Sequence, residues 1–167
     1  MTDIPDFAIN GRTFRARLEL DECMGPPWEE HCGHGVVSEW TQRAKRPGEV
    51  AIAGDGPRGC PRRYYDIQES TKIARRDGWD AKPYGGTRGE KAARAVEADF
   101  ERLRQWCEGH WCWVSLVVTP LCQCCGEPME GEAQWLGGIE GDSGEDYFAG
   151  EARELAEEWL SQQRAAA

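Results

Sequence analysis

An Asn-Gly pair at residues 10 and 11 constrains the fold most, because it predicts a tight β-hairpin near the start of the printed chain. Both residue types tolerate the positive φ angles of a type I′ turn. Apolar residues then alternate along the second arm and define one face of it: Phe14, Ala16, Leu18 and Leu20. This alternation predicts an antiparallel strand with one face in the core and the other towards solvent or a partner.

Three later segments carry helix signals. Asp66 is a candidate N-cap with Glu69 three residues later, and Gly78 would end that helix. Thr87 and Glu90 repeat this capping pattern ahead of an apolar stripe that ends near Gly109. Ser143 can cap a third helix. The apolar stripe of this last helix is Phe148, Ala152, Leu155, Ala156, Trp159 and Leu160.

In residues 111–119 both alternating sets of positions are apolar, which predicts a central strand covered on both faces. Residues 133–139 predict a second strand. Residues 21–63 are rich in proline and glycine and predict a long irregular loop with a short strand at 50–53. A chain of 167 residues suits one domain. We expect a single α+β domain over residues 1–164, with about three helices packed on a mostly antiparallel sheet and a frayed tail at 165–167.

Charge is sorted along the chain. Residues 1–40 carry a net charge of −5, residues 41–94 carry +6, and residues 95–167 carry −11. We expect the basic segment to pair in part with the acidic ends, leaving surplus carboxylates exposed. The total of −10 repels phosphate at long range, so direct binding of nucleic acid is not expected.

No apolar run is long enough for a transmembrane helix, and the first residues lack the features of a secretory signal. We therefore expect a cytoplasmic protein with no membrane partner. In that compartment structural disulfides are rare, so the eight cysteines would be core residues, metal ligands or incidental.

Cys122 and Cys125 form a C-x-x-C motif followed by glycine, which is half of a zinc-knuckle pattern. A tetrahedral zinc site needs four ligands. The candidate set pairs these two cysteines with His31 and His34. Other candidate partners in the long loop are Cys23, Cys32 and Cys60. The competing interpretation is a hairpin tip with small polarisable side chains and no cofactor, which we favour.

Residues 28–34 place two imidazoles, a thiol and two carboxylates close together in the sequence. These groups serve metal-assisted hydrolysis and general acid–base catalysis. Gly33 and Gly35 disfavour a regular helix, so nothing in the sequence fixes His31 and His34 on one face. We assign no catalytic residue and favour a protein that is not an enzyme.

Two stretches are candidate binding surfaces. The first is the Trp-rich loop, with Trp28, Glu29, Glu30 and Trp40. The second is the acidic last helix, with Glu151, Glu154, Glu157 and Glu158. Carboxylates on a rigid frame can steer a basic partner and can imitate the phosphates of nucleic acid.

Residues 14–19, 27–40, 73–79 and 93–103 resemble uncharacterised small accessory proteins of tailed phages and prophages. The resemblance implies an accessory protein in the cytoplasm of an infected or lysogenic bacterium, and it supplies no catalytic residue. We expect a non-enzymatic protein that binds a host protein, in host takeover or inhibition of defence. The alternatives are a zinc-stabilised nucleic-acid-associated module that uses the basic middle, and a metal-dependent hydrolase centred on His31 and His34.

Overall fold

The computed structural model describes residues 4–31, 33–54, 59–80 and 85–166. Contacts divide the chain into two compact units, where the sequence predicts one domain. Unit 1 comprises Met1–Met24 and Trp111–Ala167, and unit 2 comprises Gly25–His110. Each unit has its own antiparallel sheet and its own hydrophobic core, so the predicted α+β class is confirmed.

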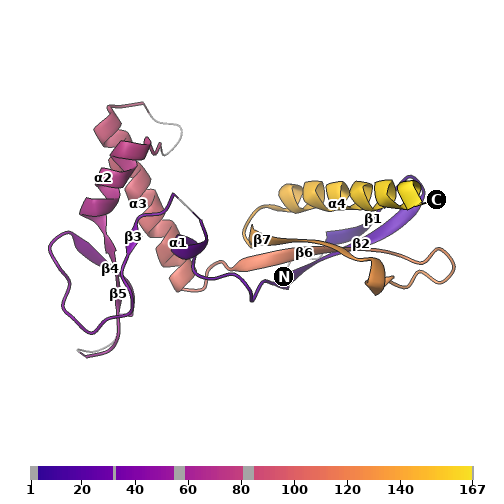
Figure 1. The fold of residues 1–167 in the computed structure, drawn as a ribbon, viewed down its shortest axis with the longest axis horizontal. Coiled ribbons are helices and arrows are strands. Elements are labelled where there is room, and N and C mark those ends of the chain that lie inside the picture. The colour runs from indigo at the N-terminus through magenta and orange to yellow at the C-terminus, as the bar shows by residue number, and fades with distance from the viewer. Residues whose placement is uncertain (1–3, 32, 55–58, 81–84, 167) are drawn as a thin grey trace. The chain divides into compact units, whose positions relative to one another are not determined.

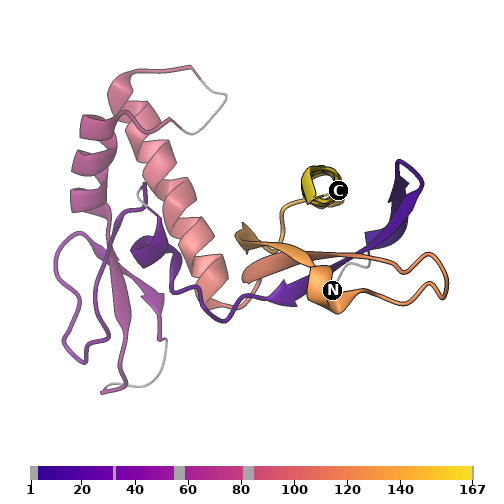
Figure 2. The same ribbon diagram turned by 45° about the vertical axis from the view of Figure 1, so that its right-hand side comes forward.

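Unit 1 is a four-stranded sheet in the order β1-β2-β6-β7, with helix α4 along one face (Figures 1 and 2). Its elements are β1 (Ile4–Ile9), β2 (Arg12–Leu20), β6 (Trp113–Pro120), the 3-10 turn η1 (Glu130–Glu132), β7 (Gln134–Glu140) and α4 (Glu145–Ala166). Asn10 and Gly11 have φ angles of 50° and 78°, which confirms the predicted hairpin turn. Strands β6 and β7 match the two strands expected at 111–119 and 133–139.

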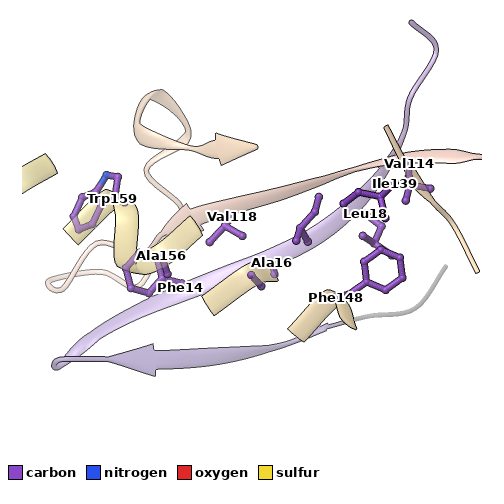
Figure 3. Close-up of a cluster of buried hydrophobic side chains, with 11 residues drawn as sticks. Phe14, Ala16, Leu18, Val114, Val118, Ile139, Phe148, Ala156 and Trp159 are labelled. Carbon is purple, nitrogen blue, oxygen red and sulfur yellow. The ribbon is translucent and has the colours of Figure 1, made fainter. Parts of the chain in front are cut away.

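The core of unit 1 lies between the sheet and α4 (Figure 3). Phe14, Ala16 and Leu18 of β2 are buried there, as their alternation predicts. Leu20 is the exception: its side chain is 59% exposed, because the described core ends at Leu18 and β2 ends with Leu20. From α4, the predicted stripe contributes Phe148, Ala152, Ala156 and Trp159 to the buried cluster.

Unit 2 packs two helices against a small sheet in the order β3-β5-β4 (Figure 1). Its elements are α1 (Pro27–Glu30), β3 (Val36–Val37), β4 (Glu49–Ala53), β5 (Arg63–Asp66), α2 (Ile67–Asp77) and α3 (Arg88–Cys107). The strand expected at 50–53 is β4. The rest of segment 21–63 differs from the expected irregular loop, because α1, β3 and the first residue of β5 also lie in it.

Both predicted helix starts in unit 2 are confirmed. The Asp66 side chain accepts a hydrogen bond from the Glu69 N–H, and Gly78 ends α2 in the left-handed conformation. Thr87 and Glu90 form a reciprocal capping box at the start of α3. The Glu90 carboxylate accepts the Thr87 N–H at 2.8 Å and so occupies this helix end.

A buried ion pair fixes the chain between the Trp-rich loop and β4. The Glu49 carboxylate lies 2.6 Å from Arg43 Nη1 and also accepts the Arg46 N–H at 2.6 Å. Its side chain is only 7% exposed, and Arg43 stacks 5.0 Å above the centroid of the Tyr64 ring. The Arg43 hydrogen bond is the main reason that the pKa of Glu49 falls to about 2.

Replacing Glu49 by Gln tests this pair through the pH dependence of stability. The folded pKa lies below the ordinary value, so the stabilisation is complete above about pH 4.5 and is lost as the pH falls towards 2. We expect Glu49→Gln to cost roughly 2 kcal/mol at pH 7, measured by urea unfolding. The difference from wild type should shrink steadily between pH 5 and pH 3.

Glu39→Gln is the matched control, since it makes the same change at an exposed side chain. It should change the free energy of unfolding by less than about 0.5 kcal/mol at either pH. A Glu49→Gln deficit that is the same at pH 7 and pH 3 would contradict the assigned role of the pair.

Candidate binding site

The described part of unit 2 contains a pocket of about 250 Å³ with aromatic walls. The end of β4 forms part of the wall. The polar and aromatic lining consists of Trp28, Trp40, Arg63, Trp106, Cys107 and Glu108. Burial raises the pKa of the Cys107 thiol, so this sulfur stays protonated and behaves as an apolar group.

Arg63 is the cation of this pocket. Its guanidinium carbon lies 5.0 Å from the ring centroid of Trp28 and 5.1 Å from that of Trp40. Its Nε atom is buried and has no hydrogen-bond partner among the described residues. Cation–π contacts hold such a group without satisfying its N–H donors. The pocket lining therefore includes one cation that is held against two aromatic rings.

Backbone pairing sets Trp40 beside Arg63. Thr41 and Arg62 exchange two backbone hydrogen bonds of 2.8 Å, and Ser38 donates its N–H to the Tyr64 carbonyl. Residues 38–41 thus run alongside residues 62–64. Trp40, in the middle of this stretch, remains 53% exposed.

Helix α1 contributes Trp28 to the pocket, where it packs against Trp106. The Trp28 ring meets the Trp106 ring edge to face, at 5.5 Å between centroids and 82° between planes. Pro26 and Pro27 fix the start of this single turn, and the Glu30 carboxylate accepts the Gly25 N–H at 2.9 Å. Such packing leaves Trp28 half-buried and holds its ring in place.

The structure brings together two of the four binding residues predicted in the Trp-rich loop. Trp28 and Trp40 share the pocket, whereas Glu29 and Glu30 are exposed on α1 and do not line it. Sequence reasoning missed the contributions of Arg63 and Trp106. Arg63 was visible only as one cation of the basic segment, and Trp106 only as a neighbour of the apolar stripe of α3.

The four predicted acidic residues all lie on α4, in unit 1. Glu154, Glu157 and Glu158 are exposed, and Glu151 is half-buried. Burial and the Glu151 carboxylate raise the pKa of Tyr147 one turn earlier. This helix therefore presents an acidic outer face, separate in sequence and unit from the aromatic pocket.

Four basic residues of segment 41–94 have ion-pair partners within the same segment. Arg43 pairs with Glu49, Lys72 with Glu69, Arg76 with Asp77, and Lys91 with Asp80. All eight residues lie between positions 41 and 94. Short-range pairing on a helix or turn explains this, because neighbours in sequence meet at the lowest entropic cost. Partial pairing of this segment with the acidic ends stays a prediction.

His34 belongs to a buried hydrogen-bond network. Its Nδ1 lies 2.6 Å from one Asp99 oxygen, and the other oxygen accepts the Tyr65 hydroxyl at 2.7 Å and the Gly35 N–H at 2.8 Å. Asp99 thereby ties the loop before β3, strand β5 and helix α3 together. Burial raises the pKa of Tyr65, so its hydroxyl remains a donor.

The Asp99 carboxylate holds the imidazole through Nδ1, so Nε2 is the ring nitrogen that Asp99 does not engage. No described residue is hydrogen-bonded to that Nε2. Cys32, the thiol of the predicted hydrolase cluster, lies outside the described residues. The network thus has a clear structural role, and the described residues supply no nucleophile for it.

The predicted metal ligands fall in different units. Cys122 and Cys125 lie in the β6–β7 connection of unit 1, while His31 and His34 belong to unit 2. The thiol of Cys124 joins those of Cys122 and Cys125, and all three sulfurs lie within 4.8 Å of one another. His34 uses Nδ1 for Asp99, which leaves only its Nε2 for any metal.

Comparison with known protein families, with curated proteins and with solved structures found no match. Phage origin and the identity of a partner therefore stay predictions from the sequence. Among the described residues, no helix combines the length and apolar character needed to cross a membrane.

Replacing Gly35 by Ala tests the network around Asp99. A Cβ at this buried position would overlap the hydroxyls of Tyr65 and Ser70. Because both hydroxyls are held by hydrogen bonds, we expect Gly35→Ala to cost roughly 2 kcal/mol or more, measured as the shift of the urea unfolding midpoint.

Gly85→Ala is the control, because its Cβ would meet no atom within 4 Å. Gly85→Ala should shift the urea unfolding midpoint by no more than about a quarter of the shift that Gly35→Ala causes. Equal effects of the two substitutions would contradict close packing at Gly35.

Proposed function

We propose that this chain is a non-enzymatic binding protein that takes an anchoring side chain of a partner protein into the pocket around Arg63. The observation that carries the proposal is the exposed Trp40 next to an arginine whose buried Nε lacks a partner among the described residues. Tryptophan and arginine are the side chains most enriched at binding hot spots.

The size of the pocket favours a side chain over a free small molecule. Sites for drug-sized ligands usually enclose about 300–1,000 Å³, whereas this pocket measures about 250 Å³. The tryptophans would cover the apolar part of the anchor, and Arg63 would donate to an oxygen on it. An anchor with a carboxylate or amide oxygen fits this lining best.

The acidic face of α4 is a second surface of the same proposal. Carboxylates held on a rigid helix raise the association rate with basic partners and make binding sensitive to salt. The resemblance to small phage and prophage proteins gives the biological setting, in which the partner is a host protein in the bacterial cytoplasm. Binding that blocks a host factor needs no catalytic group.

Capture from bacterial extract tests the proposal. The tagged full-length protein should retain one discrete protein in near-equimolar amount at low salt. Trp40→Ala should reduce its recovery at least tenfold, because truncating a hot spot costs about 2 kcal/mol or more. Trp135→Ala is the matched control, since this tryptophan of β7 is 72% exposed and lies outside the pocket.

A variant with a neutralised α4 distinguishes binding at the acidic face from binding at the pocket. It combines four substitutions: Glu151→Gln, Glu154→Gln, Glu157→Gln and Glu158→Gln. If it abolishes recovery while Trp40→Ala does not, the acidic face is the binding surface and the pocket is not. If nothing exceeds background at low salt, or if Trp135→Ala weakens recovery as much as Trp40→Ala, the pocket proposal fails.

A further inference from the structure

The connection between β6 and β7 folds into a tight turn that carries three thiols. The Cys122 N–H donates to the Glu127 carbonyl and the Gly126 N–H to the Cys122 carbonyl, both at 2.8 Å. Leu121 and Pro128 form an isolated bridge just outside this turn. Gly126 has a φ of 75°, a conformation that glycine adopts without strain. The turn is therefore defined by its own backbone.

Within this turn the sulfur of Cys122 is the focus of polar contacts. It lies 2.9 Å from the Cys124 sulfur, and the Cys125 sulfur lies within 4.8 Å of both. Cysteine binds zinc through its sulfur atom, so three neighbouring sulfurs offer three ligands. Each of these features is local to residues 122–126.

From this geometry we propose that Cys122, Cys124 and Cys125 form a three-thiolate zinc site that is complete within the β6–β7 turn. Zinc–sulfur bonds are about 2.3 Å long, which separates the sulfurs of a tetrahedral site by about 3.8 Å. The three sulfurs already lie within 4.8 Å of one another, so small side-chain rotations bring them to that spacing.

The site keeps an open fourth position. Cys124 and Cys125 are exposed, and Cys122 also lines a surface hollow of about 530 Å³ beside the β1–β2 turn. Water, or a donor side chain of another molecule, can reach the ion from there. Three protein ligands with an open position distinguish this site from a closed structural zinc centre. It also needs neither His31 nor His34, unlike the ligand set predicted from the sequence.

Zinc titration of the reduced full-length protein, against a chromophoric chelator at neutral pH, tests the site. We expect one zinc per chain, and at least a tenfold loss of affinity for each of Cys122→Ser, Cys124→Ser and Cys125→Ser. Cys112→Ser is the matched control, since it removes another exposed thiol of unit 1. Far-ultraviolet circular dichroism should be unchanged in all four variants, because the turn is held by backbone bonds.

Four results would overturn the proposal. Unchanged affinity in Cys124→Ser would leave only the two-thiol half-site of the C-x-x-C motif. A loss of zinc affinity in the double variant His31→Ala/His34→Ala that equals the loss in the cysteine variants would favour the mixed set of cysteine and histidine ligands. A stoichiometry below about one-tenth of an equivalent, or equal weakening by Cys112→Ser, would mean that the turn holds no zinc. None of these results bears on the aromatic pocket, so the two proposals fail separately.

Discussion

The pairing of β2 with β6 is the constraint on which the rest of the structure depends. It joins seven residues of the first strand pair to a strand almost a hundred positions later, Phe14 opposite Pro120 and Leu20 opposite Val114. This pairing creates the surface that α4 covers. It also brings the two ends of unit 2 together, since the Asp21 N–H bonds to the Trp113 carbonyl. Unit 2 is thus an insertion between two neighbouring strands of unit 1.

The two units carry different chemistry. Unit 1 holds the acidic outer face of α4 and the three-thiol turn, both on a rigid sheet-and-helix frame. Unit 2 holds the aromatic pocket, whose walls come from short elements fixed by caps, a buried ion pair and the contacts of Asp99. In each case local backbone pairing decides where the functional side chains lie, as the Thr41–Arg62 bridge does for Trp40. The acidic face of α4 thus belongs to unit 1, and the basic residue of the pocket, Arg63, belongs to unit 2.

Local signals in the sequence predicted much of this fold. The Asn10-Gly11 turn, the caps at Asp66 and Thr87, and the apolar stripe of α4 each depend on residues a few positions apart. Short strands and the division into units depend on long-range pairing, which no local pattern encodes. The pocket was half predicted for the same reason: Trp28 and Trp40 stand out by type, but only tertiary packing brings Arg63 and Trp106 to them. Leu20 was misassigned because alternation cannot tell where a core ends.

The insertion also orders events during synthesis. Residues 25–110 form a continuous stretch, so unit 2 can complete all its own contacts as soon as His110 has left the ribosome. Strand β2 precedes unit 2 in the chain, whereas β6, β7 and α4, which complete its sheet and cover its apolar face, follow unit 2. Residues that follow unit 2 in the chain therefore complete the part of unit 1 that precedes it.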